Sequence, residues 1–233
     1  MRPVVFIPEF VHSGGCELLK TECDIVAPWF EGVPVMDMPQ SDLAHRKSLY
    51  ESDAVIVRTF TISSEDINRA VRLKAIVNHG VGVDNIDLKA AKAHGVPVAY
   101  TPTGNTNAVA EHVIALLMSL SRRVIPARQA LIDGRFTDRN DYRGIEVAGK
   151  TLGIIGFGRI GNQVAKKATG MDMNVVAYDA FIPPENFPRH VTGFDSLEEV
   201  LTSADIITLH VPLTPETHHM INVSTLRLMK PEV

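Results

Sequence analysis

The chain lacks the features typical of secreted, membrane-spanning or nucleic-acid-binding proteins. Its two cysteines, Cys16 and Cys23, are too few for a disulfide framework and too far apart for a CxxC pair, which favours reduced thiols. No apolar run approaches the roughly 20 residues that cross a bilayer, and no signal peptide precedes the first strand-like segment. The net charge of −4 gives no general attraction for phosphate backbones. These absences predict a cytoplasmic protein with no membrane and no nucleic acid as partner.

A glycine-rich segment is the most informative feature that is present. Gly156, Gly158 and Gly161 form a GxGxxG pattern between an apolar run and a helical stretch, and Asp179 ends the next apolar run, 18 positions after Gly161. In this setting the first glycine permits a tight turn, the second lets a pyrophosphate approach the backbone, and the third allows the helix to pack closely on the sheet. The pattern predicts a dinucleotide site, with a structural glycine turn as the alternative.

The residues around this pattern favour NAD over NADP. Unpaired amides at the helix N-terminus, including those of Arg159 and Ile160, attract an anion because the helix macrodipole is positive there. Asp179 is placed to accept a hydrogen bond from a ribose 2′-hydroxyl and would repel a 2′-phosphate. Ala180 and Phe181 supply no cation beside it. The expected cofactor-binding residues here are Gly156, Phe157, Gly158, Arg159, Ile160, Gly161 and Asp179.

Short apolar strands alternate with helical segments along the whole chain, which predicts an α/β fold with doubly wound parallel sheets. A polar connection through residues 138–143 precedes the glycine-rich unit. A complete mononucleotide-binding pair has about six strands, so the second sheet looks unfinished. Strands are expected over 4–7, 25–26, 54–57, 75–77 and 97–100, and around 152, 175 and 206. Helices are expected from Ser63, with Asp66 completing a capping box, over 87–94, over 197–203, and from about Asn105.

Four motifs follow one another in a fixed order: 78–87, 101–111, 149–161 and 210–214. Together they resemble the D-isomer-specific 2-hydroxyacid dehydrogenases, a family that includes phosphoglycerate, glycerate, D-lactate and formate dehydrogenases. The resemblance implies a flavodoxin-like substrate domain over 1–103 and a Rossmann NAD-binding domain over 104–233. It also implies a hydride transfer between the nicotinamide of NAD and a small 2-hydroxy or 2-keto acid, in a homodimer that forms through the Rossmann domain.

Individual site residues follow from this resemblance. The loop of Gly80, Val81 and Gly82 is similar to one whose amides bind the substrate carboxylate, with a plain β-turn as the alternative. Asn105 matches a position near the substrate and is equally suited to cap the long helix. On the cofactor side, the resemblance implies contacts from Val81, Val109, His210, Val211, Pro212 and Thr217.

Two other positions bear on the substrate. Arg58 resembles an arginine that phosphoglycerate dehydrogenases direct at a substrate phosphate, although an exposed residue at a strand end is an equally good interpretation. Asn78 stands where a second such arginine is expected. The residues therefore leave lactate, glycerate and phosphoglycerate open as substrate types.

The histidines of the last third are not assigned to chemistry. His210 is interpreted as a loop residue at a strand end rather than as a general base. His218 and His219 suggest a metal pair, but adjacent rings are expected to point apart and no carboxylate or cysteine is suitably spaced nearby. A solvated face without metal is the prediction.

By the resemblance, the arginine that grips the substrate, the histidine that transfers the proton and the glutamate that orients it lie beyond Val233. No catalytic residue is expected within the 233 residues, which predicts near inactivity of this chain alone. The alternatives are a truncated, non-catalytic NAD-binding pseudoenzyme and a corepressor-like binding module. An apolar strand edge near Ile206 predicts poor solubility.

Overall fold

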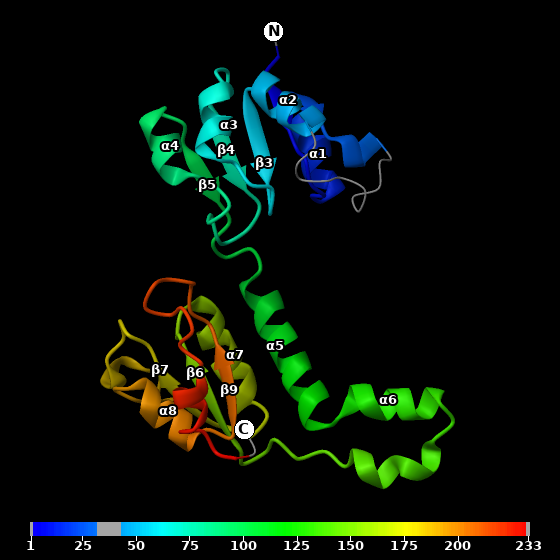
Figure 1. Ribbon diagram of the computed structural model, residues 1–233, viewed down its shortest axis with the longest axis vertical. Helices are drawn as coiled ribbons and strands as arrows, with labels where there is room; N and C mark the ends of the chain where they lie inside the picture. The colour runs from blue at the N-terminus through cyan, green and yellow to red at the C-terminus, as the bar shows by residue number, and fades with distance from the viewer. Residues whose placement is uncertain (1, 32–42, 232–233) are drawn as a thin grey trace. The chain divides into compact units, whose positions relative to one another are not determined.

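The computed structural model describes residues 2–31 and 43–231 and divides into two compact units, Met1–Asn105 and Thr106–Val233 (Figure 1). Each unit has a parallel sheet and hydrophobic clusters of its own. Over the described ranges, no helix combines the length and the apolar character that a bilayer span requires.

The first unit is built on a sheet with the strand order β2-β1-β3-β4-β5, the doubly wound order of flavodoxin-like folds. All its pairs are parallel. This order confirms the predicted fold class, and every expected strand of this unit is present. The strands are β1 Val4–Phe6, β2 Asp24–Val26, β3 Ala54–Val57, β4 Ala75–Asn78 and β5 Val98–Tyr100.

Both faces of this sheet are covered because successive side chains of a strand point to opposite sides. In β3, Val55 and Val57 join a cluster with residues of α2, α3 and α4, whereas Ala54 and Ile56 pack with Cys16 of α1. The apolar runs without polar alternation are therefore explained by burial on two faces. The helices are α1 Ser13–Lys20, the 3₁₀ turn η1 Pro28–Glu31, α2 Leu43–Glu51, α3 Ser64–Arg69 and α4 Leu88–Ala93.

The expected helix ends are confirmed. Ser63 and Asp66 form the reciprocal capping box at the start of α3. Asp87 caps α4 by accepting the amide of Ala90 at 2.9 Å, and Gly95 follows that helix with a left-handed φ of 68°. These caps set where the chain leaves each helix and enters the next strand.

The second unit has the strand order β8-β7-β6-β9, which is the 3-2-1-4 part of a Rossmann sheet. The three strands expected here are confirmed as β6, β7 and β9, and β8 is a fourth strand that the sequence prediction missed. β8 is two residues long and contains a glycine, so it has no apolar period to detect. The strands are β6 Thr151–Ile155, β7 Asn174–Tyr178, β8 Thr192–Gly193 and β9 Ile206–Leu209.

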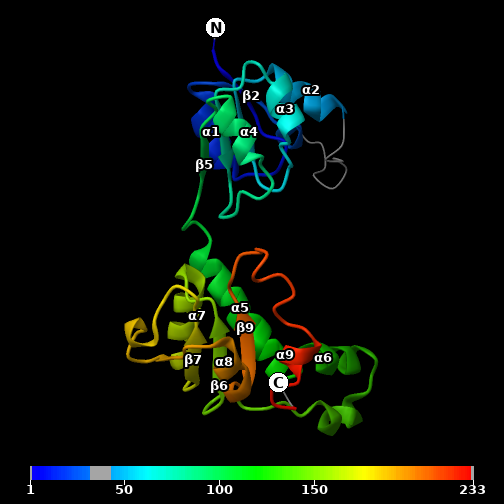
Figure 2. The ribbon, with the colours of Figure 1, turned by 60° about the vertical axis from the view of Figure 1, so that its left-hand side comes forward.

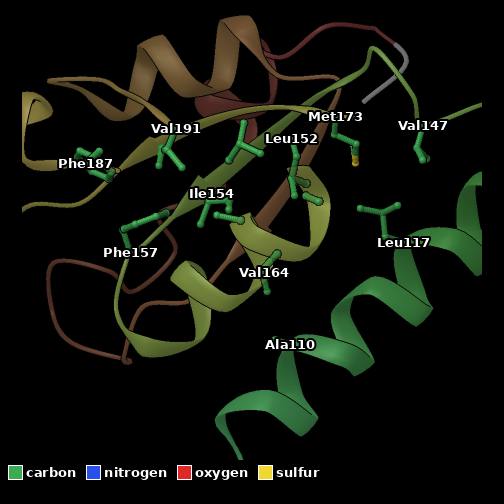
Figure 3. Close-up of a cluster of buried hydrophobic side chains, with 14 residues drawn as sticks. Ala110, Leu117, Val147, Leu152, Ile154, Phe157, Val164, Met173, Phe187 and Val191 are labelled. Carbon is green, nitrogen blue, oxygen red and sulfur yellow. The ribbon is translucent and has the colours of Figure 1, made fainter. Parts of the chain in front are cut away.

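The main core of this unit lies between the sheet and two helices, α5 Thr106–Ser121 and α7 Arg159–Thr169. Figure 3 shows Leu117 of α5 and Val164 of α7 beside Leu152 and Ile154 of β6. A smaller cluster on the other face contains Leu201 of α8 Leu197–Ser203. The Rossmann sheet is thus covered on both faces.

The sequence did not predict a helix in the segment after α5. The chain forms α6 Val124–Ile132 there, and the 3₁₀ helix η3 Phe136–Tyr142 takes in most of the polar connection at 138–143 (Figure 2). Ile125, Leu131 and Phe136 are exposed here, so no buried apolar face marks these helices in the sequence. Two shorter elements complete the unit, η4 Pro184–Asn186 and α9 Val223–Leu226.

Candidate functional site

The turn between β6 and α7 needs glycine at two positions for reasons of space. Gly156 has a φ of 89°, and a Cβ atom there would lie 2.6 Å from the carbonyl oxygen of His210. A Cβ atom on Gly161 would overlap the carbonyl oxygen of Gly156. Both glycines therefore serve the close contact of strand, turn and helix.

Gly158 differs from Gly156 and Gly161 because a side chain at this position would not clash with the folded chain. It is the N-cap of α7 with φ −68° and ψ −159°, and no atom lies within 4 Å of the position that its Cβ would take. Its carbonyl accepts the first helical amide, that of Asn162, at 3.0 Å. The amides of Arg159, Ile160 and Gly161 have no partner in the described part of the chain. An open, amide-lined helix start of this kind fits a pyrophosphate.

Asp179 lies at the carboxyl end of β7, beside this turn. One carboxylate oxygen accepts the amide of Phe157 at 2.7 Å, and the other accepts the amide of Phe181 at 2.9 Å. Each oxygen keeps a further lone-pair direction for a ribose hydroxyl. No ion pair of Asp179 occurs among residues 2–31 and 43–231, so nothing there offsets its repulsion of a 2′-phosphate.

A pocket of about 280 Å³ adjoins Asp179, and the sequence prediction missed it. Aromatic and aliphatic side chains, two prolines and the carboxylates of Asp179 and Asp195 line it, which offers a nucleobase both apolar faces and hydrogen-bond acceptors. The proline pair after β7 was the available signal, because it fixes the backbone of the loop that forms one wall. The lining residues are Tyr178, Asp179, Ala180, Phe181, Ile182, Pro183, Pro184, Phe194 and Asp195.

Three expected cofactor residues have structural tasks that the sequence did not reveal. The side chain of Phe157 is buried and contacts the ring of Phe187, with centroids 4.9 Å apart. Thr217 closes the loop after β9: its hydroxyl donates to the carbonyl of Pro212 at 2.6 Å and accepts the amide of Thr214 at 2.8 Å. Val211 packs against the cluster around Leu201. The loop that begins at His210 is therefore ordered by its own contacts.

His210 follows β9 directly and is half-buried. Its amide donates to Ile155 at 2.7 Å, and its Nε2 lies 3.0 Å from the hydroxyl of Thr208. Burial lowers the pKa of His210 below its usual value, which favours a neutral ring at neutral pH. These contacts are consistent with a loop residue.

The interpretation of His218 and His219 needs one correction. Their rings do not point apart but stack, with centroids 3.8 Å apart and planes 20° apart. The left-handed φ of 55° at His219 turns the chain back on itself and changes the direction of its side chain. Within the described residues, no group of three or more histidine, cysteine or acidic side chains is arranged to hold a metal ion.

In the first unit, the loop after β4 presents free backbone amides. The carbonyl of Gly80 accepts the amide of Thr101 at 3.0 Å and its hydroxyl at 3.2 Å. The carbonyl of Gly82 accepts the side-chain amide of Asn78. The amides of residues 80–85 donate to no group in the part of the chain that the structure describes. Such a run of unpaired N–H groups can bind an anion.

A neighbouring cluster of amides is already filled by a carboxylate of the chain, which the sequence prediction also missed. Glu9, just after β1, accepts the backbone amides of Arg58 at 2.6 Å, Thr59 at 2.9 Å and Phe60 at 2.9 Å. Burial alone would raise the pKa of Glu9, but the Thr59 hydroxyl and these amides lower it below its usual value. An acidic residue at a strand end is the sequence signal that could have found it.

The remaining expected residues lie at exposed or partly exposed positions. Arg58 is exposed, and its guanidinium donates to the carbonyl of Phe10 at 3.3 Å. Asn105 is exposed before α5, and both of its expected roles, at the substrate and as the helix cap, stay predictions. Val81 is exposed in the first unit and Val109 is partly buried in the second. Their contacts with a cofactor stay predictions.

The Rossmann strand order, the glycine turn and the carboxylate at its side define a dinucleotide-binding α/β protein. Residues 114–233 match the family described as "D-isomer specific 2-hydroxyacid dehydrogenase, NAD binding domain". The chain belongs to this family of NAD-dependent dehydrogenases, and its cofactor is NAD. The fold and the resemblance expected from the sequence are thereby confirmed.

Known relatives cover nearly the whole chain. It is 37% identical over 237 residues to a glyoxylate reductase of Thermococcus kodakarensis, covering 99% of this chain and 69% of the relative. It is 36% identical over 231 residues to the chloroplastic D-3-phosphoglycerate dehydrogenase 2 of Arabidopsis thaliana, covering 98% of this chain and 35% of the relative. The chain thus spans about a third of the length of the plant relative.

A solved structure gives a similar picture. The D-lactate dehydrogenase of Aquifex aeolicus, complexed with NAD and lactic acid, matches with a TM-score of 0.78 and 30% identity, covering 97% of this chain and 66% of that chain.

Proposed function

We propose that this chain supplies the NAD site and the substrate-carboxylate loop of an oxidoreductase that acts on the CH–OH group of a small 2-hydroxy acid. The observation that carries the proposal is the open helix start at Gly158. There, unpaired amides can bind a pyrophosphate, and the nearby Asp179 carboxylate can accept a hydrogen bond from a ribose hydroxyl. When bound, NAD accepts or gives a hydride at the substrate C2.

The residues of the second unit bind and select the cofactor in this proposal. The amides of Arg159, Ile160 and Gly161 hold the pyrophosphate, because the fixed dipoles of a helix start favour negative charge. Asp179 accepts a ribose hydroxyl and disfavours a 2′-phosphate. The pocket beside it receives the adenine. Val109 and the loop from His210 to Thr217 line the nicotinamide side.

The residues of the first unit hold the acid. The amides of the Gly80–Val83 loop bind the substrate carboxylate, and Asn105 contacts the substrate. Arg58 adds one positive charge for a further anionic group, while the second position of this kind is the neutral Asn78. A small acid with a single negative charge fits this set better than a phosphorylated acid, since one exposed arginine gives weak recognition of phosphate.

Proton transfer is the part of the reaction that these residues do not supply. His210 lies against Thr208, and its lowered pKa reflects burial rather than a carboxylate partner. Without an oriented acid or base, the rate falls by about 10²- to 10⁴-fold. We therefore propose that the 233 residues alone bind both ligands and turn over little.

The exposed apolar face of α5 and α6 is proposed as the contact with a second copy of the chain. Leu116 and Leu120 of α5 and Ile125 of α6 are 56%, 79% and 72% exposed. Leu116 and Leu120 are four residues apart and so share a face of α5, and exposed apolar side chains that adjoin in this way mark an interaction site. The resemblance to homodimeric dehydrogenases supports this choice of partner.

Titration of the chain with NADH, followed by cofactor fluorescence, tests the proposed function. We expect saturable binding of NADH and at least about tenfold weaker binding of NADPH, since the latter brings a phosphate to Asp179. A folded chain that shows no saturable association with NADH would refute the proposal.

A further inference from the structure

Asn78 is the one buried polar side chain with an unpartnered atom among the described residues. It ends β4, is 2% exposed, and its side-chain nitrogen donates to the carbonyl of Gly82. Its Oδ1 atom has no hydrogen-bond partner in the part of the chain that the structure describes. Because an unpaired buried acceptor destabilises a fold, folding alone gives little reason for an amide here.

The effect of Asn78 on the neighbouring loop gives such a reason. Peptide groups are planar, and no peptide bond in the described chain is cis, so each carbonyl points opposite to the N–H of the next residue. Fixing the carbonyl of Gly82 toward Asn78 therefore turns the amide of Val83 away from it. In the same way, Thr101 holds the carbonyl of Gly80 and turns the amide of Val81.

Glycine at position 80 is part of the same arrangement. A Cβ atom on Gly80 would lie 3.0 Å from the side-chain nitrogen of Asn78, a contact tighter than most, so the amide of Asn78 would have to move aside. The glycine thus leaves room for the amide of Asn78 to pass under the loop and reach Gly82. A neutral side chain in this place adds no cation, so backbone amides alone carry the recognition of the anion by the loop.

We infer that Asn78 is a positioning residue that orients the free amide of Val83 toward the single carboxylate of a 2-oxo acid. Thr101 does the same for the amide of Val81 by holding the carbonyl of Gly80. The inference rests on the proposed function, because that proposal makes this loop the substrate-carboxylate site. It adds the residues that set the direction of the amides and limits the ligand to a carboxylate bound by dipoles.

Oxamate, a small carboxylate with a carbonyl beside it, is a suitable probe for the 233-residue chain. We expect the backbone amide resonances of Val81 and Val83 to shift saturably when oxamate is added. In Asn78→Leu, the Kd from these shifts should rise about tenfold, since one oriented amide is lost. The urea midpoint of this variant should stay equal or rise, because leucine has a similar size and removes the unpaired Oδ1.

Asn174→Leu is the control. The Asn174 side chain also donates to a glycine carbonyl, that of Gly149 at 3.0 Å, but it lies outside the 80–85 loop. Its loss should leave the Kd for oxamate unchanged. A purely structural role of Asn78 predicts the opposite pattern, with a lower urea midpoint and an unchanged Kd, and that result would overturn the inference.

Thr101→Val decides the question if Asn78→Leu does not fold. Thr101 is exposed, and valine removes only the hydroxyl bond to Gly80, so the fold should persist and the Kd should rise about threefold. An unchanged Kd would contradict the positioning of the loop. If the unaltered chain binds NADH but shows no shift of Val81 and Val83 with oxamate, the proposed substrate loop fails, and the inference fails with it.

Discussion

Replacing Gly158 with alanine should separate cofactor binding from folding. The φ of −68° is open to alanine, and no atom lies within 4 Å of the new methyl group. Reduced freedom of the unfolded chain stabilises the variant by about 0.4–1 kcal/mol. Alanine is a poorer N-cap than glycine, which costs a similar amount. The free energy of unfolding should therefore change by less than about 1 kcal/mol.

Binding of NADH should change much more in the same variant. The methyl group would occupy the open space at the helix start, where the pyrophosphate must approach the amides of Arg159 and Ile160. A hydrogen bond to a charged group contributes about 1.5–3 kcal/mol, so losing one raises the Kd by roughly 10- to 150-fold. This effect is larger than any change expected in stability.

Fluorescence titration with NADH and urea unfolding of the same samples measure the two quantities. Gly161→Ala is the contrasting variant, because its methyl group would overlap the carbonyl of Gly156 and should destabilise the fold by about 1–3 kcal/mol. Gly158→Ala with an unaltered Kd for NADH would show that the pyrophosphate does not bind at this helix start, which would remove the basis of the proposed cofactor site.

Three further changes test other parts of the molecule. In Asp179→Asn, the Kd for NADH should rise about tenfold, and the ratio of the Kd for NADPH to the Kd for NADH should fall. Titration with both cofactors measures this ratio, and an unchanged ratio would contradict the role of Asp179. The Val4 amide first, then Lys74 and Arg72, lower the pKa of Asp53 from 3.8 to about 2. The stability that Asp53 contributes is present above pH 3.8 and is lost as the pH falls through about 2. The urea midpoint of Asp53→Asn should therefore vary less with pH in this window than that of the unaltered chain. In Ile125→Asp, the molecular mass measured by light scattering should fall from that of a dimer to that of a monomer. A dimer that persists would contradict the proposal that the α5–α6 face forms the contact.

Most strands of this fold can be predicted from the sequence because they are short, apolar and buried on two faces. The runs at 54–57 and 174–178 meet these conditions and lie where they were expected. β8 was missed because its pairing comes from tertiary contacts rather than from pattern. α6 was missed because its apolar residues face outward, which removes the amphipathic signal on which helix prediction depends.

The cofactor turn could be predicted because each glycine has a local role in a fixed order. The role of Glu9 could not, because it depends on amides about 50 positions away that only the fold brings near. Asn78 stood out in the sequence merely as a missing arginine. Its contact with Gly82 and its unpaired oxygen appear only when the burial of the loop is known.

Two clusters of backbone amides lie at the carboxyl ends of the neighbouring strands β3 and β4, and a carboxylate of the chain binds one of them. After β3, the amides of residues 58–60 donate to the carboxylate of Glu9, and this negative charge would repel a second anion. After β4, the amides of residues 80–85 remain free, while the glycine carbonyls are held by Asn78 and Thr101. Since both clusters have the same backbone chemistry, their side chains decide which one is open. In the proposed function, selectivity for one carboxylate thus comes from filling one cluster with Glu9 as much as from shaping the other with Asn78 and Thr101.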